Sequence, residues 1–189
     1  MAGILTIYIL EQNKITVRKV IYILLFLVLV FCKKDDDGYR VYTVKAGEHF
    51  CDNVIPTVKL NKHSLQFWFK VNDTWVMPHF SWSKIAGLSE GDHRENSCRL
   101  VYRCSNGFKI IGMYTIMNGI IDAHYLDTIT NGEYYCDIGR VGDRWELTFC
   151  GEVYTSKAGK RGDFNSRLYP YIGGDETIDH DWVVPIRFL

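Results

Sequence analysis

The sequence predicts an all-β fold, an antiparallel β-sandwich of the jelly-roll or concanavalin-like lectin type, after an N-terminal signal segment. Two observations support this. From residue 39 onward, short segments that alternate apolar and polar residues follow one another, separated by Gly, Asn and Asp, and none shows apolar residues at helical spacing. About ten strands joined by short turns, without βαβ alternation, favour two packed antiparallel sheets over a closed barrel.

The composition agrees with a β-rich globular domain. Aromatic residues make up 14% of the chain, and 16 glycines stand against only 4 prolines. The 22 Lys and Arg residues balance 22 Asp and Glu residues. Because the chain carries no net field to attract polyanions, we expect no nucleic acid among its partners.

The N-terminus differs from the rest of the chain. Lys14, Arg18 and Lys19 precede an apolar run at 20–31, which ends at Cys32 and the sequence KKDDDG. The run is shorter than the ~20 residues that cross a bilayer, and a basic flank before a short apolar run is typical of a secretory signal. The alternative, an anchor extended back through residues 15–19, would bury cations in lipid.

These features define three expected segments. Residues 1–32 form a signal segment with a lipobox-like cysteine, residues 33–38 an acidic tether, and residues 39–189 a single β-sandwich domain.

The region around Cys32 resembles a bacterial lipoprotein signal. Leu29 and Val30 fit the lipobox pattern, whereas Phe31 stands where a small residue is usual. The acidic cluster at 35–37 resembles the export tag of Bacteroidota-type surface lipoproteins. The resemblance implies lipidation at Cys32 and a bacterial outer-membrane location, lipid-anchored and surface-exposed.

Alternation assigns the strands and their faces. Trp145, Leu147 and Phe149 point to one side of the segment 143–150, and Gly151 is expected to take positive φ in a tight hairpin before the strand 153–156. The segment 64–71 also alternates, with Leu65, Phe67, Phe69 and Val71 on its apolar side. Further strands are predicted at 39–46, 98–104, 108–117, 120–126, 133–139, 166–172 and 181–188.

Two segments are expected to be irregular. Pro185 should confine the last strand to a sheet edge or a bulge, because proline donates no ladder hydrogen bond. The stretch 78–96 is the longest without a strand pattern and is predicted to be a long loop, which in a compact domain is often functional.

Two blocks, 82–103 and 166–188, resemble a group of Bacteroidota secreted or lipid-anchored β-sandwich proteins that has no assigned activity. The matching residues are Lys84, Gly87, His93, Asn96, Ser97, Arg99, Leu168, Tyr169, Pro170, Tyr171, Gly173, Gly174, Glu176, His180 and Asp181. The sequence departs from the group at Ile172 and at Ile178-Asp179. The resemblance implies the fold and the compartment, and it leaves the chemistry open.

Arginines and tyrosines suggest a ligand-binding face. If Leu168 and Ile172 face the core, then residues 167, 169 and 171 form an outward row. Aromatic rings stack on apolar sugar faces, and guanidinium groups bind carboxylates or sulfates. The predicted ligand-binding residues are Arg99, Arg103, Arg167, Tyr169, Tyr171, His93 and Asn96. The alternative is cross-strand Arg–Tyr packing that only covers the sheet.

A second candidate site is the acidic loop at 172–182, IGGDETIDHDW. Its carboxylates could contribute to a calcium site, but their spacing does not match the EF-hand pattern. The residues concerned are Asp175, Glu176, Asp179 and Asp181. An acidic turn between two strands is the favoured interpretation, and no other cofactor is expected.

The function predicted from these patterns is a surface-exposed lipoprotein that acts as a carbohydrate-binding or assembly module, with a glycan or a surface protein as its partner. The alternative is a small jelly-roll polysaccharide lyase acting on a uronate glycan, which needs Arg or Asn to neutralise the carboxylate and His or Tyr to move the proton. Candidates of these types are Arg99, Asn96, His93, His124, Tyr114 and Tyr125.

Overall fold

Two antiparallel six-stranded sheets pack face to face in the computed structural model, which describes residues 37–51, 57–76, 81–173 and 177–189. The strands are β1 (Arg40–Val44), β2 (Thr57–Leu60), β3 (Ser64–Val71), β4 (Ser83–Glu90), β5 (Asn96–Ser105), β6 (Phe108–Met117), β7 (Ile120–Ile129), β8 (Gly132–Val141), β9 (Arg144–Phe149), β10 (Glu152–Lys157), β11 (Asn165–Leu168) and β12 (Trp182–Phe188).

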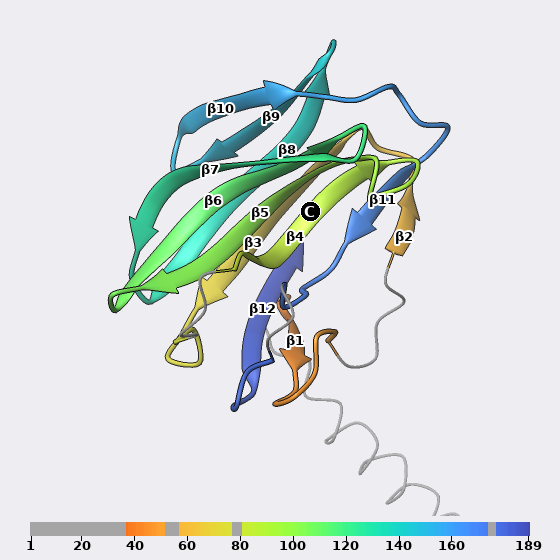
Figure 1. Ribbon diagram of the computed structural model, residues 1–189. Coiled ribbons are helices and arrows are strands. Elements are labelled where there is room, and N and C mark those ends of the chain that lie inside the picture. Colours follow the sequence, from red (N-terminus) through yellow and green to blue (C-terminus); the bar gives the residue numbers. More distant parts are fainter. Residues whose placement is uncertain (1–36, 52–56, 77–80, 174–176) are drawn as a thin grey trace, which may run out of the picture. The chain divides into compact units, whose positions relative to one another are not determined.

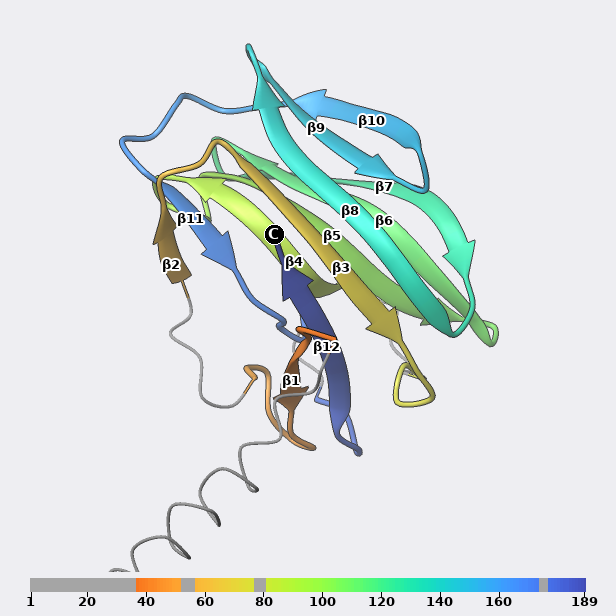
Figure 2. The ribbon, with the colours of Figure 1, turned by 180° about the vertical axis from the view of Figure 1, so that it is seen from behind.

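The strand order is β2-β11-β4-β5-β6-β7 in one sheet and β1-β12-β3-β8-β9-β10 in the other. In Figure 1 the first of these sheets is nearer the viewer. Figure 2 shows the molecule from the opposite side, with the second sheet in front. The runs β4-β5-β6-β7 and β8-β9-β10 are consecutive in the chain, whereas the other neighbours come from distant parts of the sequence. Every pairing is antiparallel. The predicted antiparallel sandwich is therefore confirmed.

The core between the sheets contains the side chains that alternation placed there. Trp145, Leu147 and Phe149 are at most 1% exposed, as predicted, and Phe67 and Phe69 are fully buried. Three aromatic side chains pack together in one part of the core: the Trp75 ring centroid is 4.8 Å from that of Tyr102 and 5.4 Å from that of Trp182.

Tight turns connect several strands as the sequence predicts. Cys150 and Gly151, between β9 and β10, have φ values of 50° and 84°. The Asn-Gly pairs at 106–107 and 118–119 also have positive φ at both positions. This is the type I′ geometry, whose twist suits a two-residue hairpin and which glycine and asparagine adopt at low cost.

The prediction of a long loop at 78–96 is wrong, because β4 lies inside it. Seven of the eight β4 positions are buried, so the strand has no solvent-exposed face. A strand covered on both faces loses the alternation that identifies half-buried strands. The short strand β2 was also not predicted.

The last strand is not at an edge, contrary to the expectation from Pro185. β12 lies between β1 and β3. Pro185 pairs with Val41 of β1, whereas pairing with β3 begins only at Ile186. The ladder is therefore one-sided at the proline, which lets an interior strand contain it.

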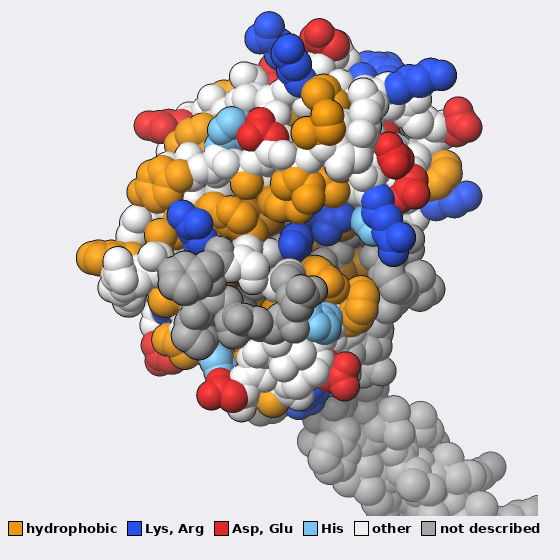
Figure 3. Space-filling view, viewed as in Figure 1, with side chains coloured by type: hydrophobic (Ala, Val, Ile, Leu, Met, Phe, Trp, Pro, Cys, Tyr) orange, Lys and Arg blue, Asp and Glu red, His pale blue; other side chains and the backbone are white. Residues whose placement is uncertain are grey.

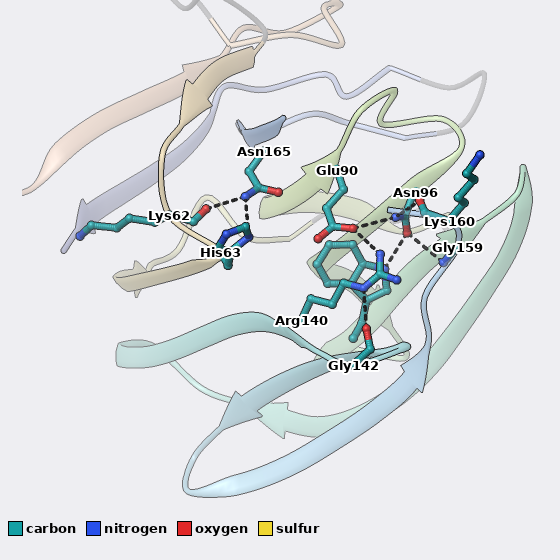
Figure 4. Close-up of polar contacts among 10 residues, drawn as sticks. Lys62, His63, Glu90, Asn96, Arg140, Gly142, Gly159, Lys160 and Asn165 are labelled. Atoms are coloured by element: carbon teal, nitrogen blue, oxygen red, sulfur yellow. Dashed lines mark hydrogen bonds and ion pairs between the residues drawn. The ribbon is translucent and has the colours of Figure 1, made fainter. Parts of the chain in front are cut away.

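One end of the interior contains a polar cluster instead of apolar packing (Figure 4). Glu90 and Arg140 form an ion pair whose side chains are only 4% and 6% exposed. The Asn96 amide lies beside this pair: its Nδ2 donates to Glu90 and to the Lys160 carbonyl, and its Oδ1 accepts from Trp145 Nε1 and Gly159 N. Asn96 thus links both sheets to the 158–160 segment.

Residues 39–189 form one compact unit. Cys32 and most of the tether lie outside the described residues. In the part of the chain that the structure describes, no helix has the length and apolar character needed to span a membrane.

Candidate ligand-binding site

The site begins with Arg99 on the outer face of β5. Cys98 and Leu100 point into the core, so Arg99 points away from it, yet its side chain is only 9% exposed. The residue opposite Arg99 in β4 is Gly87. A Cβ atom at Gly87 would lie 2.6 Å from Arg99 Cγ, so the missing side chain makes room for the arginine to lie flat across β4.

Lys84 brings a second cation to this face. Its backbone N donates to the Tyr171 carbonyl at 2.7 Å and its carbonyl accepts from Tyr171 N at 2.9 Å, which attaches the segment after β11 to β4. The Lys84 Nζ donates to the Trp82 carbonyl at 2.9 Å. It also lies 5.0 Å from the Tyr114 ring centroid and 5.4 Å from that of Tyr171.

These side chains line a pocket of about 490 Å³. Its lining residues are Phe50, Cys51, Lys84, His93, Arg94, Arg99, Tyr114, Ile116, Leu168, Tyr169, Pro170 and Tyr171. Figure 3 shows this face, with hydrophobic side chains gathered near its middle and lysine and arginine side chains beside them. The described lining therefore combines apolar surface with cations and contains no Asp or Glu.

Burial and like charge affect the cations. Burial and then the positive charge of Arg99 lower the pKa of Lys84 to about 8. Burial lowers the pKa of Arg99 to about 10, against an opposing effect of Tyr114 and Tyr171. Burial and then Arg99 also lower the pKa of His93. The pocket is thus a place where positive charge lacks compensation and where an anion would be stabilised.

The Arg99 Nε atom supports the same conclusion. It is buried and has no hydrogen-bond partner among the described residues. A buried donor without an acceptor is costly, and such groups in native proteins call for an explanation. A bound carboxylate or sulfate would provide the missing acceptor.

The structure brings four of the predicted ligand-binding residues together in the pocket. These are Arg99, Tyr169, Tyr171 and His93. Tyr171 packs its ring against Phe50, with the centroids 4.9 Å apart. Arg103 is on the same outer face of β5 but outside the pocket lining.

Arg167 and Asn96 are placed elsewhere, and the predicted outward row at 167, 169 and 171 is wrong. Arg167 pairs with the core residue Leu88, points to the inner side, and lies 4.2 Å from the Phe188 ring centroid. Leu168 pairs with Gly87 and lines the pocket instead. Asn96 is 3% exposed, and both polar atoms of its side-chain amide form hydrogen bonds inside the sandwich, so it does not face a ligand.

Sequence reasoning did not select Lys84 as a ligand residue and named Tyr114 only as one of several catalytic candidates. Both come from strands that pair with β5. The signal for Lys84 was the resemblance at Lys84 and Gly87, which lay in the segment predicted to be a loop. His124 and Tyr125, the other catalytic candidates, lie on the edge strand β7 and do not line the pocket.

The acidic loop can be followed only in part, since Asp175 and Glu176 lie outside the described residues. Asp181 accepts hydrogen bonds from Lys45 Nζ at 2.7 Å and from Ala46 N at 3.1 Å. These bonds, that of Lys45 first, lower the pKa of Asp181. Asp179 bonds to His180. Among the described residues no group of three or more His, Cys, Asp or Glu side chains is arranged to hold a metal ion.

No family model and no curated protein sequence matches the chain. Solved structures do match its fold. Alginate lyase A1-II′, a member of polysaccharide lyase family 7, gives a TM-score of 0.53 at 11% identity and covers 81% of this chain and 78% of its own. The catalytic domain of an endo-1,3-β-glucanase (laminarinase) from Thermotoga petrophila RKU-1 gives 0.53 at 11% identity, with 81% and 76% covered.

An alginate lyase from Alteromonas sp. 272 gives a TM-score of 0.50 at 11% identity and covers 82% of this chain and 88% of its own. At such low identity the similarity shows the fold alone. The chain is thus a jelly-roll β-sandwich with the same architecture as these enzymes.

Proposed function

We propose that the protein is a surface lipoprotein that binds an acidic carbohydrate in the pocket on the outer face of the β2-β11-β4-β5-β6-β7 sheet. The observation that carries the proposal is the pair Lys84 and Arg99, two cations that share a pocket with tyrosines and have no carboxylate in its described lining. Burying like charges together is unfavourable unless an anion offsets them.

A uronate or sulfated sugar fits this chemistry. Its anionic group would accept from the Arg99 guanidinium, including the Nε atom that lacks a partner, and from Lys84. The rings of Tyr114, Tyr171 and Phe50 offer apolar surface for the sugar ring. The shared fold with alginate lyases and a laminarinase supports a carbohydrate ligand as well.

The alternative function is β-elimination on a uronate polysaccharide, favoured by the tyrosines around Arg99. In this reaction Arg99 neutralises the carboxylate, and a base removes the proton from the carbon beside it. A carbon–carbon double bond forms, the glycosidic C–O bond breaks, and the leaving oxygen takes a proton. Lys84, with its pKa near 8, suits the base, and Tyr114, whose pKa is raised by burial, suits the proton donor.

One experiment tests both functions. Full-length protein is titrated calorimetrically with uronate, sulfated and neutral oligosaccharides, while absorbance in the near ultraviolet monitors unsaturated sugar ends. Binding of acidic but not neutral oligosaccharides, without new absorbance, supports the binding module. Arg99→Met should weaken binding at least about tenfold, since charge-assisted hydrogen bonds contribute ~1.5–3 kcal/mol. Arg144→Met, an exposed arginine on the other sheet, is the matched control and should bind normally.

Accumulating unsaturated ends would instead establish the lyase. If acidic oligosaccharides do not bind, or if they bind equally to the Arg99→Met variant, the pocket is not their site and the proposal is wrong. The assembly role would then be tested, with a surface protein as the partner.

The membrane attachment is part of the proposal. The sequence around Cys32 resembles a lipoprotein signal, so we propose that a lipid on Cys32 anchors the protein to the bacterial outer membrane. With residues 33–38 as a tether, the domain would be exposed at the surface, where it meets external glycans.

A further inference from the structure

A second arginine lies on the outer face of β5, beyond the pocket. Arg103 is four positions after Arg99, so both side chains are on the same side of the strand, about 13 Å apart along it. Between them lies Val101, which pairs with Lys84 in β4 and with Gly112 in β6 and is fully buried. The strand between the two guanidinium groups is therefore covered by other side chains, and a ligand that reaches both groups must pass over those side chains.

Trp82 holds Arg103 in place. The Arg103 Cζ atom is 4.5 Å from the Trp82 ring centroid, within the range of a cation–π contact. The ring itself is seated against the backbone of β6: a Cβ atom at Gly112 would lie 2.7 Å from Trp82 Cη2. Gly112 also follows an irregularity in the β6–β7 register. These contacts fix the arginine before any ligand is present.

Arg103 has no acidic partner among the described residues. The ion pairs found there involve other side chains, and the buried Nε atom of Arg103, like that of Arg99, lacks a hydrogen-bond partner. Arg99, Lys84 and Arg103 therefore form a line of positive groups along one face without described carboxylates. Charge repeated along a line matches a ligand whose own negative charges repeat.

We infer that Arg103 forms a second anion-binding subsite, and that the ligand is an acidic oligosaccharide long enough to reach from Arg99 to Arg103. The inference rests on the proposed function of the pocket. Trp82 is a positioning residue: it orients Arg103 and does not itself bind the anion. A single uronate would occupy the Arg99 pocket alone, whereas a longer chain would also engage Arg103.

The test compares uronate oligomers from the monomer to the hexamer, and sulfated oligomers of the same lengths, by calorimetric titration of full-length protein. In the wild type, affinity should rise by about tenfold once the oligomer reaches Arg103. Arg103→Met should bind the monomer like the wild type but lose this gain, and Trp82→Leu should lose most of it. Arg144→Met is the charge-matched control, and thermal melting checks that each variant is folded.

The outcomes separate the two proposals. If Arg99→Met abolishes binding of every oligomer while Arg103→Met changes none, the pocket is correct and the second subsite is wrong. Equal weakening of monomer and hexamer by Arg103→Met would also contradict the subsite, because it would show a general effect of charge. If no acidic oligomer binds the wild type, the proposed function itself fails. The uronate and sulfate series distinguish a carboxylate from a sulfate as the recognised group.

Discussion

Gly87 in β4 lies directly opposite Arg99 in β5, and the arginine side chain occupies the space that any larger residue at position 87 would need. The pairing explains how a cation can be almost completely covered on the outer face of a sheet. It also means that a residue with no functional group of its own determines where the guanidinium lies.

Gly87→Ala should therefore impair ligand binding without removing a charge. The new Cβ would lie 2.6 Å from Arg99 Cγ and 2.7 Å from the Cys98 carbonyl, so the arginine must move. We expect acidic oligosaccharides to bind at least about tenfold more weakly, with a loss of ~1–3 kcal/mol in the free energy of unfolding. Gly139→Ala is the control, because its nearest neighbour would be 3.6 Å away. Normal affinity in folded Gly87→Ala would show that the position of Arg99 is unimportant.

Lys84 should make binding depend on pH. Its pKa is about 8 in the free protein, and a bound carboxylate would raise it, so affinity should fall as the pH rises through 8 toward 10. Lys84→Met should bind weakly at all these pH values and lose the dependence. Calorimetry in buffers of different ionisation enthalpy should detect proton uptake on binding near pH 8. The exposed residue Lys157 provides the matched control, Lys157→Met.

Lys84 should also make stability depend on pH, and here the free energy of unfolding should rise with pH where the affinity falls. Folding lowers the pKa of Lys84 from 10.5 to about 8, so between these values the unfolded chain holds the proton more firmly. The free energy of unfolding of the ligand-free protein should then rise with pH in this window, and Lys84→Met should lack that part of the rise. Denaturant unfolding at several pH values measures it. A decrease in the wild type relative to Lys84→Met would contradict the burial of Lys84.

Asn96 should be important for stability and not for ligand affinity. Asn96→Ala leaves Trp145 Nε1, Gly159 N and the Lys160 carbonyl without their partner inside the sandwich. We expect a loss of ~2–4 kcal/mol in the free energy of unfolding, whereas the exposed Asn131→Ala should cost ~0.5 kcal/mol or less. At temperatures where Asn96→Ala is folded, its affinity should equal that of the wild type. A selective loss of affinity with normal stability would restore the predicted binding role.

The acidic loop should not respond to calcium. Asp181 already bonds to Lys45 and Ala46 and so attaches the loop to the end of β1. A true site would stabilise the protein by ~2.7 kcal/mol at a hundredfold excess of calcium over Kd. We expect no change in Tm with millimolar calcium or chelator. A calcium-dependent rise in Tm that disappears in Asp179→Asn would establish a metal site.

Cys32→Ser should remove the membrane anchor. Without an acceptor thiol the signal segment cannot be lipidated, so labelled fatty acid should not be incorporated and the protein should appear in soluble or unprocessed form. Cys150→Ser, an exposed thiol in the β9–β10 turn, is the control and should be labelled normally. Equal membrane retention of the wild type and Cys32→Ser, with the N-terminal segment still attached, would favour a transmembrane anchor.

Much of the fold could be predicted from the sequence because the information is local. Trp145, Leu147 and Phe149 alternate with polar residues, and a strand with one solvent-exposed face must show this two-residue period. The Asn-Gly and Cys-Gly turns are likewise determined by which residues tolerate positive φ. β4 could not be recognised in this way, since it is buried on both faces and thus has no alternation.

The candidate site was only partly predictable. The sequence by itself determined that Arg99 points away from the core, because neighbours in a strand alternate. Only the tertiary structure decided that Lys84 joins Arg99, that Gly87 makes room for it, and that Arg167 and Asn96 point inward. The physical reason is that strand register and pairing across 70 or more residues, such as Leu168 with Gly87, arise from packing the whole sandwich and leave no trace in local sequence patterns.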